Sequence, residues 1–337
     1  MIIKHYTDIE SDIWDEFVNS CNMGHTYYLY EMTNLPPSRE KIYKNESFGI
    51  FDNQNNLIMI FQLFLIPEKK KWYKFYRKSR INLTSFHGMC VKDNLTKKQK
   101  TELKQTFENY IDSFFKKYKK TSLFVALPQF SKMFRPENVQ HVINPLIFYN
   151  FAPMISYTYI IDLQQSVENI FGAYAQTTRN LINRIDTPPV CQIIETNKND
   201  DDFLVLKSLN QECYKNQDIN KQLTDDYLKS LYEIIKKHNY IKLFFVKTNN
   251  IVTGYIMLLY YEDSVYYFWG AGKHDSQNIQ RWFLHKLIIQ CKESGYKWFN
   301  VGAANVWLRH GKDKAISDFK KSFSHTLHPI YKGVYIP

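Results

Sequence analysis

Cysteine is sparse in this chain of 337 residues, and its arrangement argues against two kinds of protein. The five cysteines are far apart and none belongs to a CxxC pair: Cys21, Cys90, Cys191, Cys213 and Cys291. An odd number of scattered thiols is typical of reduced structural cysteines, not of a disulfide framework or a zinc site. We therefore expect no bound metal ion.

Long apolar runs are also missing. The runs at residues 57–66 and 251–261 reach about half of the ~20 residues that a membrane-spanning helix needs, so we expect them to form buried strands. The first six residues are soon followed by Asp8, Glu10 and Asp12, without the apolar stretch and cleavage site of a signal peptide. We expect a cytoplasmic protein, with the inner face of the membrane as the alternative location.

Three common motifs are absent from the sequence: GxSxG, GxxxxGK[ST] and GxGxxG. Their absence removes the simplest arguments for an α/β-hydrolase, a P-loop nucleotide-binding protein and a Rossmann dinucleotide-binding protein.

Positive charge is in excess, with 44 Lys and Arg against 33 Asp and Glu and a formal net charge of +11. Such a surface attracts anions, whether RNA, phosphorylated substrates or anionic lipid headgroups. The densest basic stretch, residues 69–80, interleaves aromatic side chains with lysine and arginine, as a peripheral membrane contact or a nucleic-acid contact would. The alternative interpretation is a solvated flank of a hairpin.

The second half of the chain predicts a regular order of elements. Ser166 and Thr224 are positioned to cap helices, and three apolar runs form an antiparallel meander. The expected elements are strand 157–163, one helix from 166 to the prolines at 188–189, strand 190–195, helix 224–238, strands 241–247, 251–261 and 265–269, helix 280–294, strand 297–301 and helix 313–323.

The first half repeats this order, although not these residues. The expected elements are helices 12–21 and 27–35, a hairpin of strands 48–51 and 57–66, a helix from Thr96 with Gln99 completing a capping box, and strand 122–127. The predicted fold class is α/β, with two units of mixed sheet flanked by helices, at residues 1–155 and 156–337.

Several local stretches resemble one family. They are WDEFV at 14–18, YIIDL at 159–163 with TRNLINR at 178–184, YYFWGA at 266–271 with GYKWFNVG at 295–302, and DFKKSF at 318–323. In this order they resemble the Fem aminoacyltransferases of bacterial cell-wall synthesis and their GNAT-like relatives. The resemblance implies two tandem GNAT-like units, of which the first is degenerate and on the acceptor side and the second carries out acyl transfer.

The chain departs from the family pattern in two places. It has no long heptad stretch for the coiled-coil arm of some Fem enzymes, and residues 273–281 contain no glycine where a CoA-dependent GNAT enzyme has its pyrophosphate loop. The implied acyl donor is therefore either aminoacyl-tRNA or acyl-CoA, used as a co-substrate, and no cofactor is expected to be permanently bound.

The resemblance and the residue types together predict which residues form the site. Lys320 matches the closing-box lysine that holds the anionic acceptor in the family, and Arg179 could grip a phosphate or carboxylate bidentately. A solvated lysine and an arginine in an ion pair between domains are the alternatives. The loop that follows the strand at 297–301 is the first choice of binding site, with His310 as a proton acceptor and with the binding residues Asn305, Trp307 and Arg309.

Four further residues are predicted to bind substrate. His87 and Gly88 lie in a stretch that resembles the acceptor side of the family, although without its proline. Tyr267 and Trp269 alternate on one strand and are expected to line the cleft together, with ordinary core packing as the alternative.

The leading functional hypothesis is transfer of an acyl or aminoacyl group to an amine of an anionic small-molecule or lipid-linked envelope precursor, either peptidoglycan or surface polysaccharide. The partners would be this precursor and, for one donor, tRNA. The first alternative is an acyl-CoA-dependent N-acyltransferase of a nucleotide-linked amino sugar. The second is a non-catalytic RNA- or membrane-surface-binding protein on a GNAT scaffold, with 69–80 as its contact.

Overall fold

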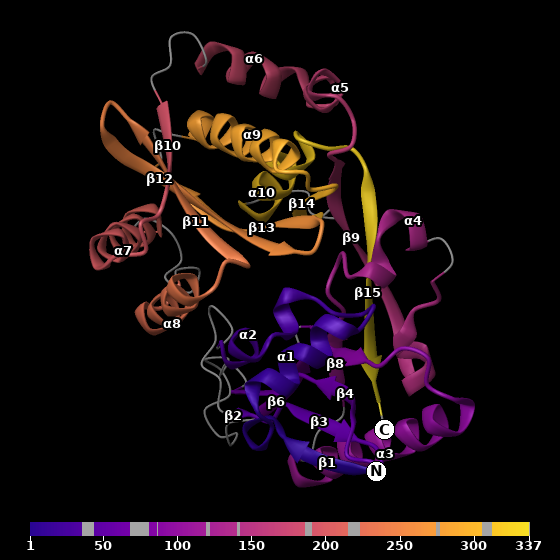
Figure 1. Ribbon diagram of the computed structural model, residues 1–337. Helices are drawn as coiled ribbons and strands as arrows, with labels where there is room; N and C mark the ends of the chain where they lie inside the picture. Colours follow the sequence, from indigo (N-terminus) through magenta and orange to yellow (C-terminus); the bar gives the residue numbers. More distant parts are fainter. Residues whose placement is uncertain are drawn as a thin grey trace, which may run out of the picture. The chain divides into compact units, whose positions relative to one another are not determined.

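The chain divides into two compact units, Met1–Ser156 with Pro329–Pro337, and Tyr157–His328 (Figure 1). The computed structural model describes residues 1–35, 44–67, 81–85, 87–118, 122–139, 142–185, 191–214, 223–273, 277–304 and 312–336. The expected division put all residues after 155 in the second unit. The C-terminal strand instead belongs to the first unit, because its residues from Lys332 to Tyr335 pair with a strand of that unit.

The second unit is built on a mixed sheet. Its neighbours are antiparallel except for one parallel pair, β13 with β14. In sheet order the strands are β10 (Cys191–Glu195), β11 (Ile241–Thr248), β12 (Ile251–Tyr261), β13 (Ser264–Gly272), β14 (Trp298–Ala304) and β9 (Phe151–Asp162), of which β9 enters from the first unit. The expected meander is confirmed as β11, β12 and β13.

Helices cover both faces of this sheet, with α9 and α6 on one side and α7 and α8 on the other (Figure 1). Ile256 and Leu258 of β12 share a buried core with Phe283 and Leu287 of α9, whereas α7 and α8 pack on the opposite face of β11, β12 and β13. The helices are α5 (Val167–Gly172), α6 (Gln176–Ile185), α7 (Asp200–Tyr214), α8 (Asp225–Lys237), α9 (Gln277–Glu293) and α10 (Lys312–Lys321).

Two expectations for the second unit were wrong or incomplete. The single helix predicted from Ser166 is two helices, α5 and α6, because the chain turns after Gly172. Helix α7 and the C-terminal strand were not expected. The two predicted caps are confirmed, since Ser166 Oγ accepts from Asn169 N at 3.2 Å and Thr224 Oγ1 accepts from Tyr227 N at 3.2 Å.

The first unit contains two strand systems. One is antiparallel, in the order β1 (Ile2–His5), β3 (Phe48–Phe51), β4 (Leu57–Phe61) and β7 (Met89–Val91). The other runs in the order β15 (Leu327–Tyr335), β8 (Leu123–Ala126), β6 (Ile81–Ser85), β5 (Phe64–Pro67) and β2 (Lys44–Asn45), with β6 and β8 parallel.

The strand predicted at 57–66 is interrupted in the structure. Gln62 separates β4 from β5, which belong to different sheets, because its buried side chain donates to Tyr27 O at 2.7 Å and to Thr33 Oγ1 at 2.8 Å. Its backbone N–H donates to Gly88 O at 3.0 Å. A buried amide in an apolar run therefore marks the point where the chain leaves one sheet for the other.

The helices of the first unit pack an aromatic core against the antiparallel sheet. Phe107 of α3 lies 5.0 Å from the Phe61 ring, centroid to centroid. The capping box of α3 is confirmed, because Gln99 N donates to Thr96 Oγ1 and Thr96 N donates to Gln99 Oε1. The helices are α1 (Ser11–Ser20), α2 (Tyr30–Asn34), α3 (Lys97–Tyr118) and α4 (Pro136–Val139).

Within the described ranges, none of these helices combines the length and the apolar composition needed to span a bilayer.

Candidate active site

The parallel strands β13 and β14 separate from one another part-way along their length. They pair only from Ser264 to Tyr266 on β13 and from Trp298 to Asn300 on β14. Beyond this point β13 remains paired with β12, and β14 remains paired with β9. Two strand edges therefore diverge at their carboxyl ends, where α/β proteins usually bind ligands. We take this divergence as the candidate active site.

A β-bulge in β14 lies where the two strands separate. The register with β9 shifts between Asn300 and Gly302, and Gly302 has a φ of +105°. The fully buried Asn300 fixes this backbone, because its Oδ1 accepts from Gly302 N at 2.8 Å and from Thr158 Oγ1 at 2.6 Å. A non-glycine residue at 302 would be strained, so the bulge depends on both glycine and the asparagine amide.

Lys320 of α10 lies against this glycine. A methyl group built on Gly302 would come within 2.6 Å of Lys320 Nζ and 3.1 Å of its Cε. The side chain is half-buried, and burial lowers the pKa of its ammonium group to about 8. No carboxylate among the described residues pairs with it. Lys320 is therefore not the solvated helix lysine of the alternative interpretation, and its ammonium group lies at the divergence of the strands.

A second half-buried cation lies on α9, the helix that follows β13. The guanidinium carbon of Arg281 is 5.5 Å from the centroid of the Phe319 ring, and Phe319 immediately precedes Lys320. Burial lowers the pKa of Arg281, which forms no ion pair with any residue that the structure describes. Arg281 therefore contacts the residue of α10 that directly precedes Lys320.

Tyr267 and Trp269 do not share a face, in contrast to the expectation. One extra residue of β13 between them, a β-bulge, pairs Tyr267 with Leu258 and Trp269 with Met257, and these adjacent residues of β12 point to opposite faces. Tyr267 packs on the core that α9 covers, and its hydroxyl would be 2.4 Å from a methyl group built on Gly270. Of the two, Tyr267 shares its face with α9.

The Arg179 side chain forms hydrogen bonds with residues of its own unit. Its Nη1 donates to Gly172 O and to Tyr174 O, each at 2.6 Å, and its Nη2 donates to Gln176 Oε1. These bonds hold the turn between α5 and α6 by satisfying carbonyls at the end of α5. The geometry gives Arg179 a structural role, and its proposed contact with substrate remains a prediction.

Other predicted residues fall outside the described part of the chain. Asn305, Trp307, Arg309 and His310, and the basic stretch at 69–80, are all in this group. Their predicted roles therefore stay predictions.

His87 and Gly88 belong to the first unit. The His87 ring stacks on Tyr27 with centroids 3.9 Å apart and planes at 6°, and burial, followed by the proximity of His25, lowers its pKa to about 3. Gly88 has a φ of +73°, and a side chain there would meet Leu127 and Val125 at 2.8 Å. A neutral imidazole can exchange hydrogen bonds with a substrate but cannot act as a cation toward it.

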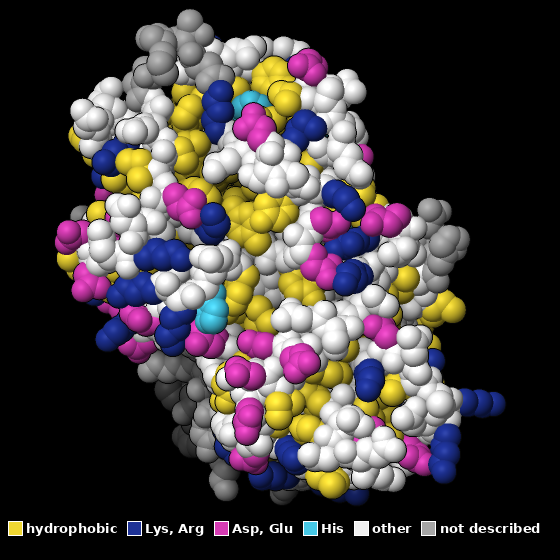
Figure 2. Space-filling view, in the orientation of Figure 1, with side chains coloured by type: hydrophobic (Ala, Val, Ile, Leu, Met, Phe, Trp, Pro, Cys, Tyr) yellow, Lys and Arg dark blue, Asp and Glu magenta, His cyan; other side chains and the backbone are white. Residues whose placement is uncertain are grey.

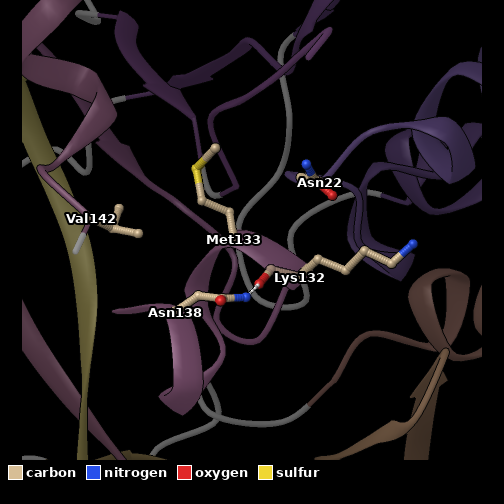
Figure 3. A pocket seen from close by; sticks show the side chains of 5 residues that line it. All are labelled: Asn22, Lys132, Met133, Asn138 and Val142. Atoms are coloured by element: carbon tan, nitrogen blue, oxygen red, sulfur yellow. Dashed lines mark hydrogen bonds between the residues drawn. The ribbon is translucent and has the colours of Figure 1, made fainter. Parts of the chain in front are cut away.

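A pocket of about 350 Å³ also lies in the first unit (Figure 3). It is lined by Asn22, Lys132, Met133, Asn138 and Val142, and the Asn138 amide donates to Lys132 O at 2.8 Å. These residues bring no carboxylate, imidazole or thiol together, and none was predicted as a site residue.

Charge on the visible face does not form one large patch. Figure 2 shows Lys and Arg side chains interspersed with Asp and Glu over this face. In the ranges that the structure covers, no group of three or more His, Cys, Asp and Glu side chains has the arrangement of a metal site. The candidate site is therefore defined by the geometry at β13 and β14, not by a metal cluster or a broad basic surface.

A family profile described as an acetyltransferase (GNAT) domain matches residues 173–321, which include Arg281, Asn300, Gly302 and Lys320. Residues 173–321 therefore form a GNAT-type acyltransferase domain. A search of curated protein sequences gave no match.

Solved structures show the same fold over the whole length of this chain, or nearly so. FemX is 13% identical with a TM-score of 0.64, covering 100% of this chain and 98% of that one. L-PGS from Bacillus licheniformis is 11% identical with a TM-score of 0.57, covering 97% and 92%. A tandem GNAT protein from the clavulanic acid biosynthesis pathway is 7% identical with a TM-score of 0.54, covering 100% and 98%. The predicted tandem GNAT-like, Fem-like fold is confirmed.

Sequence reasoning missed two residues of this site. Asn300 lies in the stretch GYKWFNVG and Arg281 at the end of residues 273–281, but the sequence alone predicted no role for either. The signal for Asn300 is an amide within the apolar strand WFNVG, and the signal for Arg281 is a cation directly before Trp282 and Phe283 near the start of a helix. Both are polar groups in an apolar context, which requires a partner or a ligand.

Proposed function

We propose that this acyltransferase forms an amide on an amine of an anionic cell-envelope precursor, of peptidoglycan or of surface polysaccharide, in the cytoplasm or at the inner face of its membrane. The observation that carries the proposal is the half-buried Lys320 ammonium group against Gly302, at the divergence of β13 and β14. A cation held there, with no carboxylate partner among the residues that the structure describes, suits an anionic substrate close to the reacting groups. The Fem-like sequence stretches support the envelope precursor as acceptor.

The reaction requires little covalent chemistry from the protein. The acceptor nitrogen attacks the carbonyl carbon of the donor, a C–N bond forms, and the ester C–O or thioester C–S bond breaks. The nitrogen loses a proton, and the leaving oxygen or sulfur gains one. Holding the two substrates together and stabilising the developing oxyanion can supply most of the rate.

Two donors remain under this proposal. Aminoacyl-tRNA is favoured by the net charge of +11 and by the lack of glycine at 273–281, and its binding would weaken steeply with salt. Acyl-CoA is favoured by the match to an acetyltransferase domain. With acyl-CoA, the second candidate function is N-acylation of a nucleotide-linked amino sugar. The alternative of a non-catalytic RNA- or membrane-surface-binding protein is not favoured, because the match to an acetyltransferase domain supports catalysis.

Mass spectrometry of reaction mixtures tests the proposal. The purified protein is incubated with nucleotide-linked and lipid-linked envelope precursors and with either charged tRNA or acyl-CoA, and the products are searched for an added acyl mass. We expect a product that Lys320→Ala abolishes and that Lys321→Ala, at the adjacent exposed position, leaves unchanged. Acylation of other amines only, with no product on any envelope precursor, would overturn the proposed acceptor.

A further inference from the structure

Three large apolar side chains of the first unit are exposed between residues 143 and 148. The exposed fractions of Ile143, Ile147 and Phe148 are 79%, 45% and 43%. Two of these residues belong to the 3₁₀ helix η4 (Pro145–Tyr149), and the third precedes it by two positions. We call the three side chains the apolar tip. Exposed apolar groups that gather in one place usually mark a contact surface.

The fold holds the apolar tip in its exposed position. Leu146 and Tyr149 are buried, and residues three apart share a face of a 3₁₀ helix, so the two residues between them point away from the core. The Asn144 side chain anchors the start of η4, because its Oδ1 accepts from Leu146 N at 3.1 Å and its Nδ2 donates to Lys332 O at 2.9 Å. The tip is therefore presented by an anchored turn.

A row of lysines on α3 leads to the apolar tip. Lys97, Lys100 and Lys104 are three and four residues apart, a spacing that puts them on one side of the helix. Lys104 Nζ is 5.5 Å from the centroid of the Phe148 ring. Lys104 also pairs with Glu108 at 3.8 Å, whereas the other two lysines form no ion pair with a residue that the structure describes. The row therefore adds positive charge next to the tip.

These lysines oppose the dipole of their own helix. Residues 97–107 contain four lysines and one glutamate, and the first turn of α3 contains no acidic residue. The N-terminal end of a helix carries a positive partial charge, so cations there destabilise the helix. An anionic surface in contact with this end would offset that cost.

We propose that the apolar tip and the lysine row form a docking surface for an anionic lipid bilayer. In such a contact the apolar side chains enter the boundary between headgroups and acyl chains, and the lysines lie among the anionic headgroups. A stable protein interface buries about 800 Å² on each partner, far more than three side chains provide, whereas a few apolar groups and cations are enough for reversible binding to a bilayer. The surface is independent of the transfer reaction, and it is distinct in sequence from the basic stretch at 69–80.

Flotation of the whole protein with lipid vesicles tests the surface. We expect binding to vesicles of phosphatidylcholine with phosphatidylglycerol, and little binding to phosphatidylcholine alone or at high salt. Phe148→Ser and Ile147→Ser should each lower the partition coefficient about tenfold, and Lys100→Gln about fivefold. The controls are Ile251→Ser, at an isoleucine of the second unit that is 62% exposed, and Lys116→Gln, at an exposed position near the other end of α3. Both should stay within twofold of the wild type.

Thermal unfolding verifies that each variant is folded. The docking surface is wrong if the protein binds no vesicles, if it binds neutral and anionic vesicles equally, or if folded Phe148→Ser and Ile147→Ser bind like the wild type. Sedimentation of the wild type as a dimer that Phe148→Ser dissociates would also overturn it, because the tip would then contact a second copy of the chain. Acylation of soluble precursors is measured separately, and it should be unchanged in these variants.

Discussion

Replacing Gly302 with alanine should displace Lys320 and raise the pKa of its ammonium group. The added methyl group would be 2.6 Å from Nζ, whereas non-bonded heavy atoms normally approach to about 3.5 Å, so Nζ must move by about 1 Å. The lysine chain is flexible, so this movement itself costs little. The positive φ of +105° adds strain of about 1 to 3 kcal/mol for a residue with a side chain.

Gly295→Ala is the matched control. Gly295 also has a positive φ, of +86°, but a methyl group there would have no neighbour within 4 Å. Both variants should therefore lose a similar free energy of unfolding, about 1 to 3 kcal/mol. Only Gly302→Ala should change the environment of Lys320.

Labelling of Lys320 with an amine-reactive ester, followed by peptide mass spectrometry across a pH series, measures the effect. A pKa of about 8 leaves about half of the Lys320 side chains neutral at pH 8, against about 0.3% for an exposed lysine. Labelling should therefore be half-maximal near pH 8 in the wild type and in Gly295→Ala, and at least one pH unit higher in Gly302→Ala. A misplacement of about 1 Å should also lower kcat/KM up to about hundredfold.

A labelling profile and a kcat/KM that both stay within about twofold of the wild type in Gly302→Ala would refute the link between Gly302 and the position of the ammonium group. Equal shifts in Gly295→Ala would also refute it, because the effect would then come from lost stability and not from the position of the ammonium group.

Three further substitutions test the framework of the site by urea denaturation. Asn300→Ala removes the acceptor of two buried donors, Gly302 N and Thr158 Oγ1, and should lower the free energy of unfolding by about 2 to 4 kcal/mol; a loss below about 1 kcal/mol would contradict this. Arg179→Ala should cost about 1 to 2 kcal/mol with unchanged kcat/KM, whereas a raised KM without lost stability would support its predicted contact with substrate. Thr224→Ala should cost about 1 kcal/mol through its lost cap, and no change would mean that water replaces the hydroxyl.

Sequence patterns predicted the helices and strands whose formation depends mainly on residues close by in the sequence. Apolar alternation defined the meander of β11, β12 and β13, and the hydroxyl of Thr224 marked the start of α8 because capping involves only residues within one turn. The order of these elements, together with short sequence stretches, was enough to predict tandem GNAT-like units.

The remaining features depend on partners far away in the sequence. The interruption after β4 depends on Gln62 reaching Tyr27 and Thr33, and β15 is a strand because β8, about 200 residues earlier, offers it an edge. The position of Lys320 over Gly302 depends on a bulge that local propensity does not encode. The opposite faces of Tyr267 and Trp269 arise in the same way, since one extra residue in β13 reverses the alternation.

The return of Pro329–Pro337 to the first unit has a consequence for synthesis on the ribosome. Every residue of the second unit, Tyr157–His328, is translated before the strand that completes the first unit. Domains generally fold as units and in the order of synthesis, but here the unit that starts first can be completed only last. Until β15 emerges, the β8 edge that pairs with Lys332 to Tyr335 has no partner from this strand, so the nascent chain would present this edge to chaperones or to other chains.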